Sequence, residues 1–156
     1  MVACSRTRTG GPEPMNSSPD YDSANIFAKI LRGEAPCFKV FEDERTFAFL
    51  DIMPQVEGHT LVIPKFGAAD VFSLPAEDLA ATIVTTQRLA GAVKKAFSAP
   101  GVMIAQLNGS AAGQTVFHLH FHILPRFDGI DLGMHARGMA DRGILAAHAE
   151  RIRAAL

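Results

Sequence analysis

Three of the chain's six histidines occupy alternate positions within residues 115–125, which read TVFHLHFHILP. Alternate side chains of an extended chain point to the same face. His118, His120 and His122 would therefore form one row of imidazoles. An imidazole has an unperturbed pKa of about 6.5, so near neutral pH it can serve as a nucleophile, a proton carrier or a metal ligand. The opposite row would be apolar and would consist of Phe117, Leu119, Phe121 and Ile123.

Three interpretations of the histidine row are open. It could be a solvated polar face. It could bind a metal, because the Cα atoms of two neighbouring histidines would lie about 7 Å apart. The outer pair, about 13 Å apart, could not share one ion, and no Glu, Asp or Cys lies close by. Finally, it could act on an anion, with one imidazole attacking phosphorus while its neighbours, if protonated, hold the phosphoryl oxygens.

The loop before the histidines favours the third interpretation. It carries glycines at positions 109 and 113. Because glycine has no side chain, such a loop lets backbone N–H groups approach a phosphate closely. Phosphoryl or nucleotidyl transfer is the chemistry that suits this combination.

The elements that position the histidine row are predicted by hydrophobic periodicity and turn residues. A short helix capped by Ser23, a long amphipathic helix and a closing helix are predicted over residues 24–33, 75–97 and 144–156. Strands are predicted over residues 38–42, 46–50, 58–64, 102–107 and 115–124. We expect an α+β fold, a five-stranded antiparallel sheet whose apolar face packs against the long helix.

Length and composition favour one domain with a disordered beginning. Residues 1–22 are rich in Gly, Pro, Ser, Thr and Arg, so we expect a disordered tail there. Met15 lies within this tail and is an alternative start of the protein. Residues 23–127 would form the domain, followed by a C-terminal loop and helix over residues 128–156.

Charge and cysteine content argue against several classes of protein. The net charge of −1, from 15 basic and 16 acidic residues, gives no general affinity for nucleic acid or for an anionic membrane. Cys4 and Cys37 form neither a disulfide framework nor a C-x-x-C motif, which suits the cytoplasm. No apolar run approaches the ~20 residues of a membrane span, and residues 1–14 lack the apolar core of a secretory signal.

Residues 113–126, GQTVFHLHFHILPR, resemble the signature of the histidine triad (HIT) superfamily, His-φ-His-φ-His-φ-φ with φ apolar. The resemblance extends from about residue 24 to residue 126, because residues 25–34, 49–52 and 58–65 stand in the family's order and spacing. It implies a nucleotide-binding domain that pairs as a homodimer, with the sheet continued across the two subunits.

The resemblance implies a nucleotidyl hydrolase that cleaves a purine nucleotide conjugate at its α-phosphate. His120 would attack the phosphorus and form a nucleotidyl-histidine intermediate, which water then hydrolyses. His118 and His122 would flank His120, and His59 would be a fourth histidine of the site. Asp51 would hold the ribose hydroxyls.

The same resemblance implies the remaining contacts to the nucleotide. Asn108, Gln114 and Thr115 would contact the phosphate and the leaving group. The purine pocket would be lined by Ile26, Phe27, Phe49, Ile52 and Leu61.

One departure from the family concerns metal. Many bacterial members carry Cys-φ-Phe-Cys at the start of the first helix and bind structural zinc there. In this chain those positions hold Asn25 and Ala28. We therefore expect no zinc and no other cofactor.

The superfamily's branches leave the substrate open. The N-terminal half resembles the branch that hydrolyses nucleoside phosphoramidates and aminoacyl-adenylates. Residues 85–88, TTQR, and residues 114–126 resemble the fragile histidine triad branch, which cleaves dinucleoside polyphosphates. A nucleotide-binding module with incidental hydrolysis is a further alternative.

Overall fold

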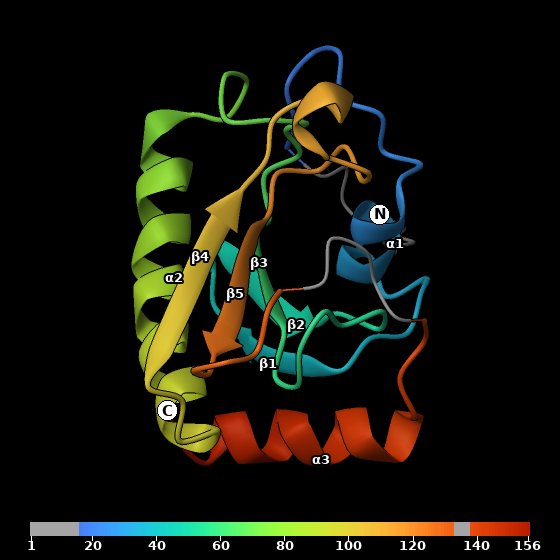
Figure 1. Cartoon of the computed structure of the whole chain (residues 1–156). Coiled ribbons are helices and arrows are strands. Elements are labelled where there is room, and N and C mark those ends of the chain that lie inside the picture. Colours follow the sequence, from blue (N-terminus) through green and yellow to red (C-terminus); the bar gives the residue numbers. More distant parts are fainter. Residues whose placement is uncertain (1–15, 133–137) are drawn as a thin grey trace, which may run out of the picture.

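The structure is a computed structural model and describes residues 16–132 and 138–156. Five antiparallel strands form one sheet in the order β1-β2-β3-β5-β4 (Figure 1). The strands are β1 (Lys39–Glu42), β2 (Thr46–Leu50), β3 (Thr60–Pro64), β4 (Gly101–Gln106) and β5 (Phe121–Arg126). The helices are α1 (Ile26–Leu31), α2 (Ala76–Ala96) and α3 (Arg142–Arg153), and a 3-10 turn covers Ser110–Ala112. The predicted α+β fold with an antiparallel sheet is confirmed.

The long helix α2 covers one face of the sheet, as the apolar periodicity predicts. Leu89 and Val93 of α2 are buried against the middle strands, where Leu50, Val62 and Ile123 point toward the helix. The third helix, α3, extends this core beside β1 with Leu145, Ala149 and Ile152. Burial of this apolar area is the main free-energy gain of the fold.

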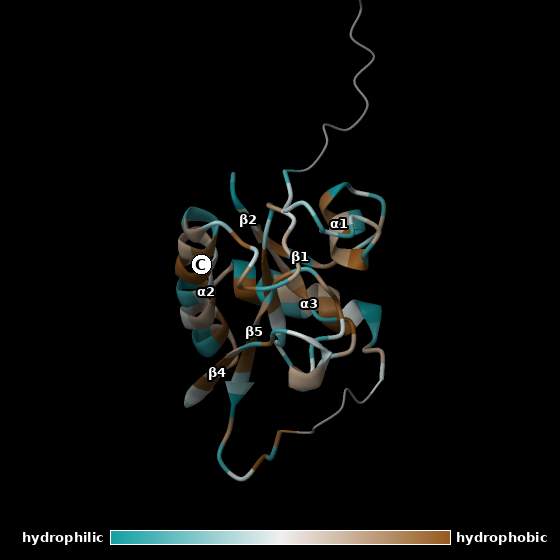
Figure 2. Ribbon diagram, turned by 90° about the horizontal axis from the view of Figure 1, so that it is seen from above, coloured by the Kyte–Doolittle hydropathy of each residue, from teal (hydrophilic) through white to brown (hydrophobic). Residues whose placement is uncertain are grey.

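The short helix α1 lies on the opposite side of the sheet from α2 (Figure 2). Phe27 and Ile30 of α1 form a second, smaller apolar cluster with Phe49 and Leu61 of the sheet. Successive residues of β2 and β3 alternate between this cluster and the main core, because side chains of a strand alternate between faces. The sheet therefore has a structural face under α2 and a second face under α1.

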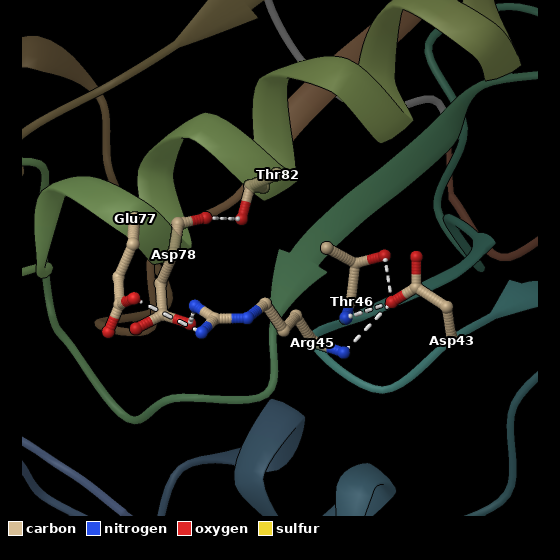
Figure 3. Close-up of polar contacts among 6 residues, drawn as sticks. All are labelled: Asp43, Arg45, Thr46, Glu77, Asp78 and Thr82. Carbon is tan, nitrogen blue, oxygen red and sulfur yellow. Dashed lines mark hydrogen bonds and ion pairs between the residues drawn. The ribbon is translucent and has the colours of Figure 1, made fainter.

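The turn between β1 and β2 is tied to the start of α2 (Figure 3). Asp43 accepts hydrogen bonds from the backbone N–H groups of Arg45 and Thr46. The Arg45 guanidinium reaches the carboxylates of Asp78, at 3.0 Å, and Glu77, at 3.2 Å, in the first turn of α2. Acidic groups also interact favourably with the positive end of a helix dipole. Glu77 and Asp78 therefore stabilise the start of α2 both through their ion pairs with Arg45 and through the dipole.

Several predicted boundaries are wrong, and two of them lie next to the histidines. Asn25, not Ser23, caps α1, since its side-chain oxygen accepts a hydrogen bond from the N–H of Ala28. The last strand begins at Phe121 rather than at residue 115 and continues through Pro125 to Arg126. Before Phe121 the chain bends, and Leu119 donates its N–H to Ala68 in a loop instead of joining the sheet. Phe117, expected in the apolar row of the core, is 45% exposed as a result.

Residues 16–22, which the sequence assigns to the tail, contact the domain. Ser17 forms an isolated bridge with Gly67, and Ser18 donates its N–H to the carbonyl of Gly67. The rest of the predicted tail, including Met15, falls outside the described residues. Among the described helices, none combines the length and apolar character needed to cross a membrane.

Candidate active site

Within the described residues, one ring nitrogen of His120 is hydrogen-bonded and the other has no hydrogen-bond partner. Its Nδ1 lies 2.7 Å from the backbone carbonyl oxygen of His118. A carbonyl only accepts, so Nδ1 carries the hydrogen and Nε2 keeps its lone pair. The ring of Phe27 meets the imidazole edge-on, with 5.1 Å between ring centroids. The second face of the sheet thus presents an oriented neutral imidazole.

His122 and His59 form a pair beside His120. His59 Nε2 lies 2.9 Å from His122 Nδ1, and His59 Nδ1 accepts the N–H of Gln55 at 3.2 Å. Since Nδ1 of His59 is an acceptor, its Nε2 carries the hydrogen and donates to His122. His122 must then carry its own hydrogen on Nε2. Within the described residues, this Nε2 is the one buried side-chain nitrogen or oxygen without a hydrogen-bond partner.

The pairing gives His122 a clear chemical role. Its ring centroid lies 4.8 Å from that of His120, so the imidazole with the unused N–H is adjacent to the imidazole of His120. A buried donor without a partner costs free energy unless a ligand supplies an acceptor. A lone pair and an N–H donor side by side can attack an electrophilic centre and bind an oxygen attached to it.

His118 contributes differently from the other two members of the row. It is fully buried, and both of its ring nitrogens are bonded within the protein. Nε2 lies 2.8 Å from the carbonyl of Pro64, and Nδ1 faces the hydroxyl of Tyr21. In this arrangement His118 supports His120 through its backbone carbonyl and offers no free nitrogen to a substrate.

Burial keeps all four imidazoles uncharged. Desolvation, with a smaller effect of the neighbouring imidazoles, lowers the pKa of His59 to about 3 and the pKa values of His118 and His122 to about 4. Burial also lowers the pKa of His120 below its ordinary value. His122 therefore presents a neutral N–H in the unliganded site rather than a protonated imidazole.

Asp51 lies beside this pair, as the resemblance requires. One carboxylate oxygen is 3.6 Å from His59 Nδ1, and burial raises the pKa of the carboxyl group. Asp51, His59 and His122 lie close enough to offer one metal-ligand atom each. The expectation that no acidic ligand lies near the histidines is therefore wrong in three dimensions. The nitrogens between His59 and His122 are, however, engaged with each other.

The loop before the triad is organised by amide side chains. Gln114 is buried, and it accepts the N–H of Gly109 and donates to the carbonyls of Ala69 and Val116. Asn108 accepts the N–H of Val71 at 2.9 Å. Both residues therefore hold the loop in shape, whereas Thr115 is exposed. Their predicted contacts with phosphate stay predictions.

The five predicted purine-pocket residues divide into two groups. Phe27, Phe49 and Leu61 are buried in the cluster under α1, next to the histidines. Ile26 and Ile52 are 48% and 46% exposed, so they can cover an entering ring system rather than fill the core. All five come from α1, β2, β3 and the residues that follow β2.

Comparison with known proteins identifies the family. The HIT domain matches residues 32–129 of the chain. This protein belongs to the HIT family. Adenosine 5'-monophosphoramidase HNT1 of Saccharomyces cerevisiae is 40% identical over 114 residues, which cover 73% of this chain and 70% of the yeast protein. Adenylylsulfatase HINT3 of Arabidopsis thaliana is 36% identical over 123 residues, which cover 79% of this chain and 61% of the plant protein.

A solved structure matches the fold of this HIT protein over most of its length. The crystal structure of a HIT-like protein involved in cell-cycle regulation from Bartonella henselae, with an unknown ligand, is 49% identical in sequence. The TM-score is 0.82, and the match covers 87% of this chain and 99% of the Bartonella chain.

Sequence reasoning missed one residue of the site, Tyr21. It was assigned to the disordered tail because the residues around it are polar. The only local signal was a single aromatic residue four positions before the Asn25 cap. Its contact with His118, 97 positions away in the chain, is not visible in any local pattern.

Proposed function

We propose that this HIT protein is a nucleotidyl hydrolase that cleaves a purine nucleotide conjugate at its α-phosphate through a nucleotidyl-His120 intermediate. The observation that carries the proposal is the pairing of a free His120 Nε2 with an unpartnered N–H on His122. An attacking lone pair beside a donor for a phosphoryl oxygen is what nucleotidyl transfer requires.

The reaction would proceed in two displacements. The lone pair of His120 Nε2 forms a bond to the α-phosphorus, and the bond from phosphorus to the leaving group breaks. The leaving group takes a proton from solvent, and the positive charge on the His120 ring is shared with the His118 carbonyl through Nδ1–H. Water then attacks the phosphorus and releases a proton to solvent, the bond to Nε2 breaks with its electron pair returning to His120, and the nucleoside monophosphate leaves. His122 donates to a phosphoryl oxygen throughout.

A phosphoramidate or an aminoacyl-adenylate is the substrate class we favour. The named relatives include a phosphoramidase and an adenylylsulfatase. One of the two stretches that resemble the dinucleoside polyphosphate branch, residues 85–88, belongs to α2 on the far face of the sheet. Thr85 bonds Thr46, and Arg88 stacks over Phe41. A packing role explains them, so they carry little weight in choosing a substrate.

The experiment compares substrates and a nucleophile variant. Adenosine 5'-phosphoramidate, diadenosine triphosphate and diadenosine tetraphosphate are given to the wild-type protein, and kcat/KM is measured for each. We expect the phosphoramidate to be preferred. His120→Asn removes the nucleophile and should lower kcat/KM by about 10³-fold or more.

His148→Asn is the matched control, because His148 belongs to α3 and its ring packs edge-on against Phe97. It should retain the wild-type rate. Wild-type turnover by His120→Asn would rule out the covalent mechanism. A preference for the diadenosine compounds would favour the alternative of a dinucleoside polyphosphate hydrolase. Tight nucleotide binding with negligible turnover would favour a nucleotide-binding module.

The setting of the reaction is also part of the proposal. We propose a cytoplasmic protein that acts on a small nucleotide and needs neither nucleic acid nor a membrane.

We also propose a homodimer paired along β4. It is supported by exposed apolar side chains at Ile104 of β4 and at Ile83 and Val84 of the adjoining α2.

A further inference from the structure

Tyr21 lies in the segment before α1, and its hydroxyl hydrogen-bonds directly to His118 of the triad. His118 donates from Nε2 to the carbonyl of Pro64, so its Nδ1 is an acceptor. The hydroxyl facing Nδ1 must therefore donate, and the donor is Tyr21. The two rings meet edge to face, with 5.5 Å between centroids.

Asn25 fixes the direction of this hydrogen bond. Its Nδ2 donates to the Tyr21 oxygen at 2.8 Å, so the hydroxyl hydrogen is left to point at His118. The other side-chain atom of Asn25, Oδ1, accepts the N–H of Ala28 and caps α1. A directed chain of hydrogen bonds thus runs from Asn25 through Tyr21 and His118 to Pro64.

Gly67 makes the space that Tyr21 occupies. A Cβ at position 67 would lie 2.6 Å from two carbons of the Tyr21 ring, which is too close for any side chain. Gly67 also bonds the segment before Tyr21, donating to the carbonyl of Asn16 at 2.7 Å and accepting from Ser18 at 2.8 Å. The segment is therefore fixed at one end by backbone bonds and at the other by the phenol.

The chain of hydrogen bonds reaches the proposed nucleophile through the backbone of His118. The His118 carbonyl holds Nδ1–H of His120 at 2.7 Å, and this bond aims the free Nε2. The side chain of His118 is anchored at both nitrogens, so its backbone has little freedom to move. Small displacements of a nucleophile cost large factors in rate.

The same place in the fold is where cysteine-bearing members of the family hold zinc. Here the corresponding residues are an amide engaged with Tyr21, at Asn25, and a fully buried methyl group, at Ala28. Neither supplies a thiolate, so the residues present do not fit a zinc ion of that kind. Within the described residues, the one group of His, Cys, Asp or Glu side chains close enough together to hold a metal consists of Asp51, His59 and His122.

We propose that Tyr21 is a positioning residue, and that the Asn25–Tyr21–His118 chain does the work of a structural metal by holding the carbonyl that aims His120. The kinetic part of this inference rests on the proposed function. The structural part does not, because the position of the ring hydrogen on His120 can be observed without any substrate.

The test removes the hydroxyl group of Tyr21. Tyr21→Phe is compared with the wild-type protein by single-turnover kinetics on adenosine 5'-phosphoramidate and by two-bond ¹H–¹⁵N spectra of histidine-labelled protein. We expect the single-turnover rate to fall about tenfold, with KM changed less than twofold. The spectra should report Nδ1–H on His120 in the wild type and a mixture of both tautomers in the variant.

A second variant and a control guard against a simple folding defect. Asn25→Asp keeps an oxygen to cap α1 but replaces the amide donor with a carboxylate that draws the Tyr21 hydrogen away from His118. It should reproduce the effects of Tyr21→Phe. Ser23→Ala changes an exposed side chain in the same segment and should change neither measurement.

The outcomes separate the two proposals. If the wild type hydrolyses none of the nucleotides but Tyr21→Phe still shifts the His120 tautomer, the proposed function fails and the positioning role stands. If the wild type is active and the His120 tautomer is unchanged in Tyr21→Phe, the positioning role is wrong, whatever happens to the melting temperature.

Tyr21 is the only tyrosine in a chain without tryptophan, so its fluorescence reports this place alone. One zinc per chain whose removal alters that fluorescence would also overturn the proposal.

Discussion

The roles of the four histidines are decided by their hydrogen-bond partners. The imidazoles are chemically identical, yet His120 keeps a lone pair, His122 keeps an N–H, and His118 keeps neither. Each difference follows from whether the neighbouring group is a carbonyl, a backbone N–H or a second imidazole. The alternation of the sequence brings the rings together, but it does not assign their tautomers.

The pH dependence of the reaction tests this assignment. His120 must be unprotonated to attack, and burial lowers its pKa below 6.5. As pH rises through that lowered pKa the nucleophile loses its proton, so kcat/KM should rise at acid pH and level off once the pH exceeds that pKa. The measurement is a pH profile of kcat/KM with adenosine 5'-phosphoramidate. An acid limb centred at or above pH 6.5 would contradict the assignment.

The elements differ in how well local sequence predicts them. The strand over residues 46–50 is predicted with its observed bounds, and the long helix is predicted within one residue at each end. The alternating pattern before Phe121 also predicts a strand, but alternation only requires an extended chain with two different faces. Whether that chain joins the sheet depends on Ala68, which takes the N–H of Leu119, and no local pattern contains this contact.

Substitution of Gly67 tests how the Tyr21 ring packs against the loop that also contains Ala68. Gly67→Ala should lower the free energy of unfolding by about 1–3 kcal/mol, because the added methyl group would overlap the Tyr21 ring. Gly91→Ala is the matched control, since Gly91 lies in α2 with open space around it and alanine is the better helix former. The free energies come from urea unfolding. Equal effects of the two substitutions would contradict the packing of Tyr21 against residue 67.

On the scale of the whole molecule, the two faces of the sheet have different roles. The α2 face builds stability, while the α1 face carries the histidines. The alternation over residues 117–123 predicts this division, because one row of side chains is apolar and the other row consists of histidines. The residue it misses, Tyr21, reaches the site through long-range contacts to Gly67 and His118.

The open edge of the sheet bears on assembly. β4 is an edge strand with Ile104 45% exposed, and such an edge invites pairing with another chain. If the proposed dimer forms here, Ile104→Lys should shift the protein from dimer to monomer in sedimentation velocity. Ile144→Lys, at a similarly exposed position on α3, should leave the dimer intact. A dimer that survives Ile104→Lys would exclude this edge as the interface.

The uncharged state of the imidazoles has a consequence for how a nucleotide would find the site. Nucleotides carry negative charge, and charged sites attract them from a distance in a way that salt suppresses. His59, His118 and His122, with pKa values of about 3 and 4, contribute no such attraction near neutral pH. Their contribution begins only at contact, through the N–H of His122. These three residues would therefore bind a nucleotide only at short range, with little sensitivity to ionic strength.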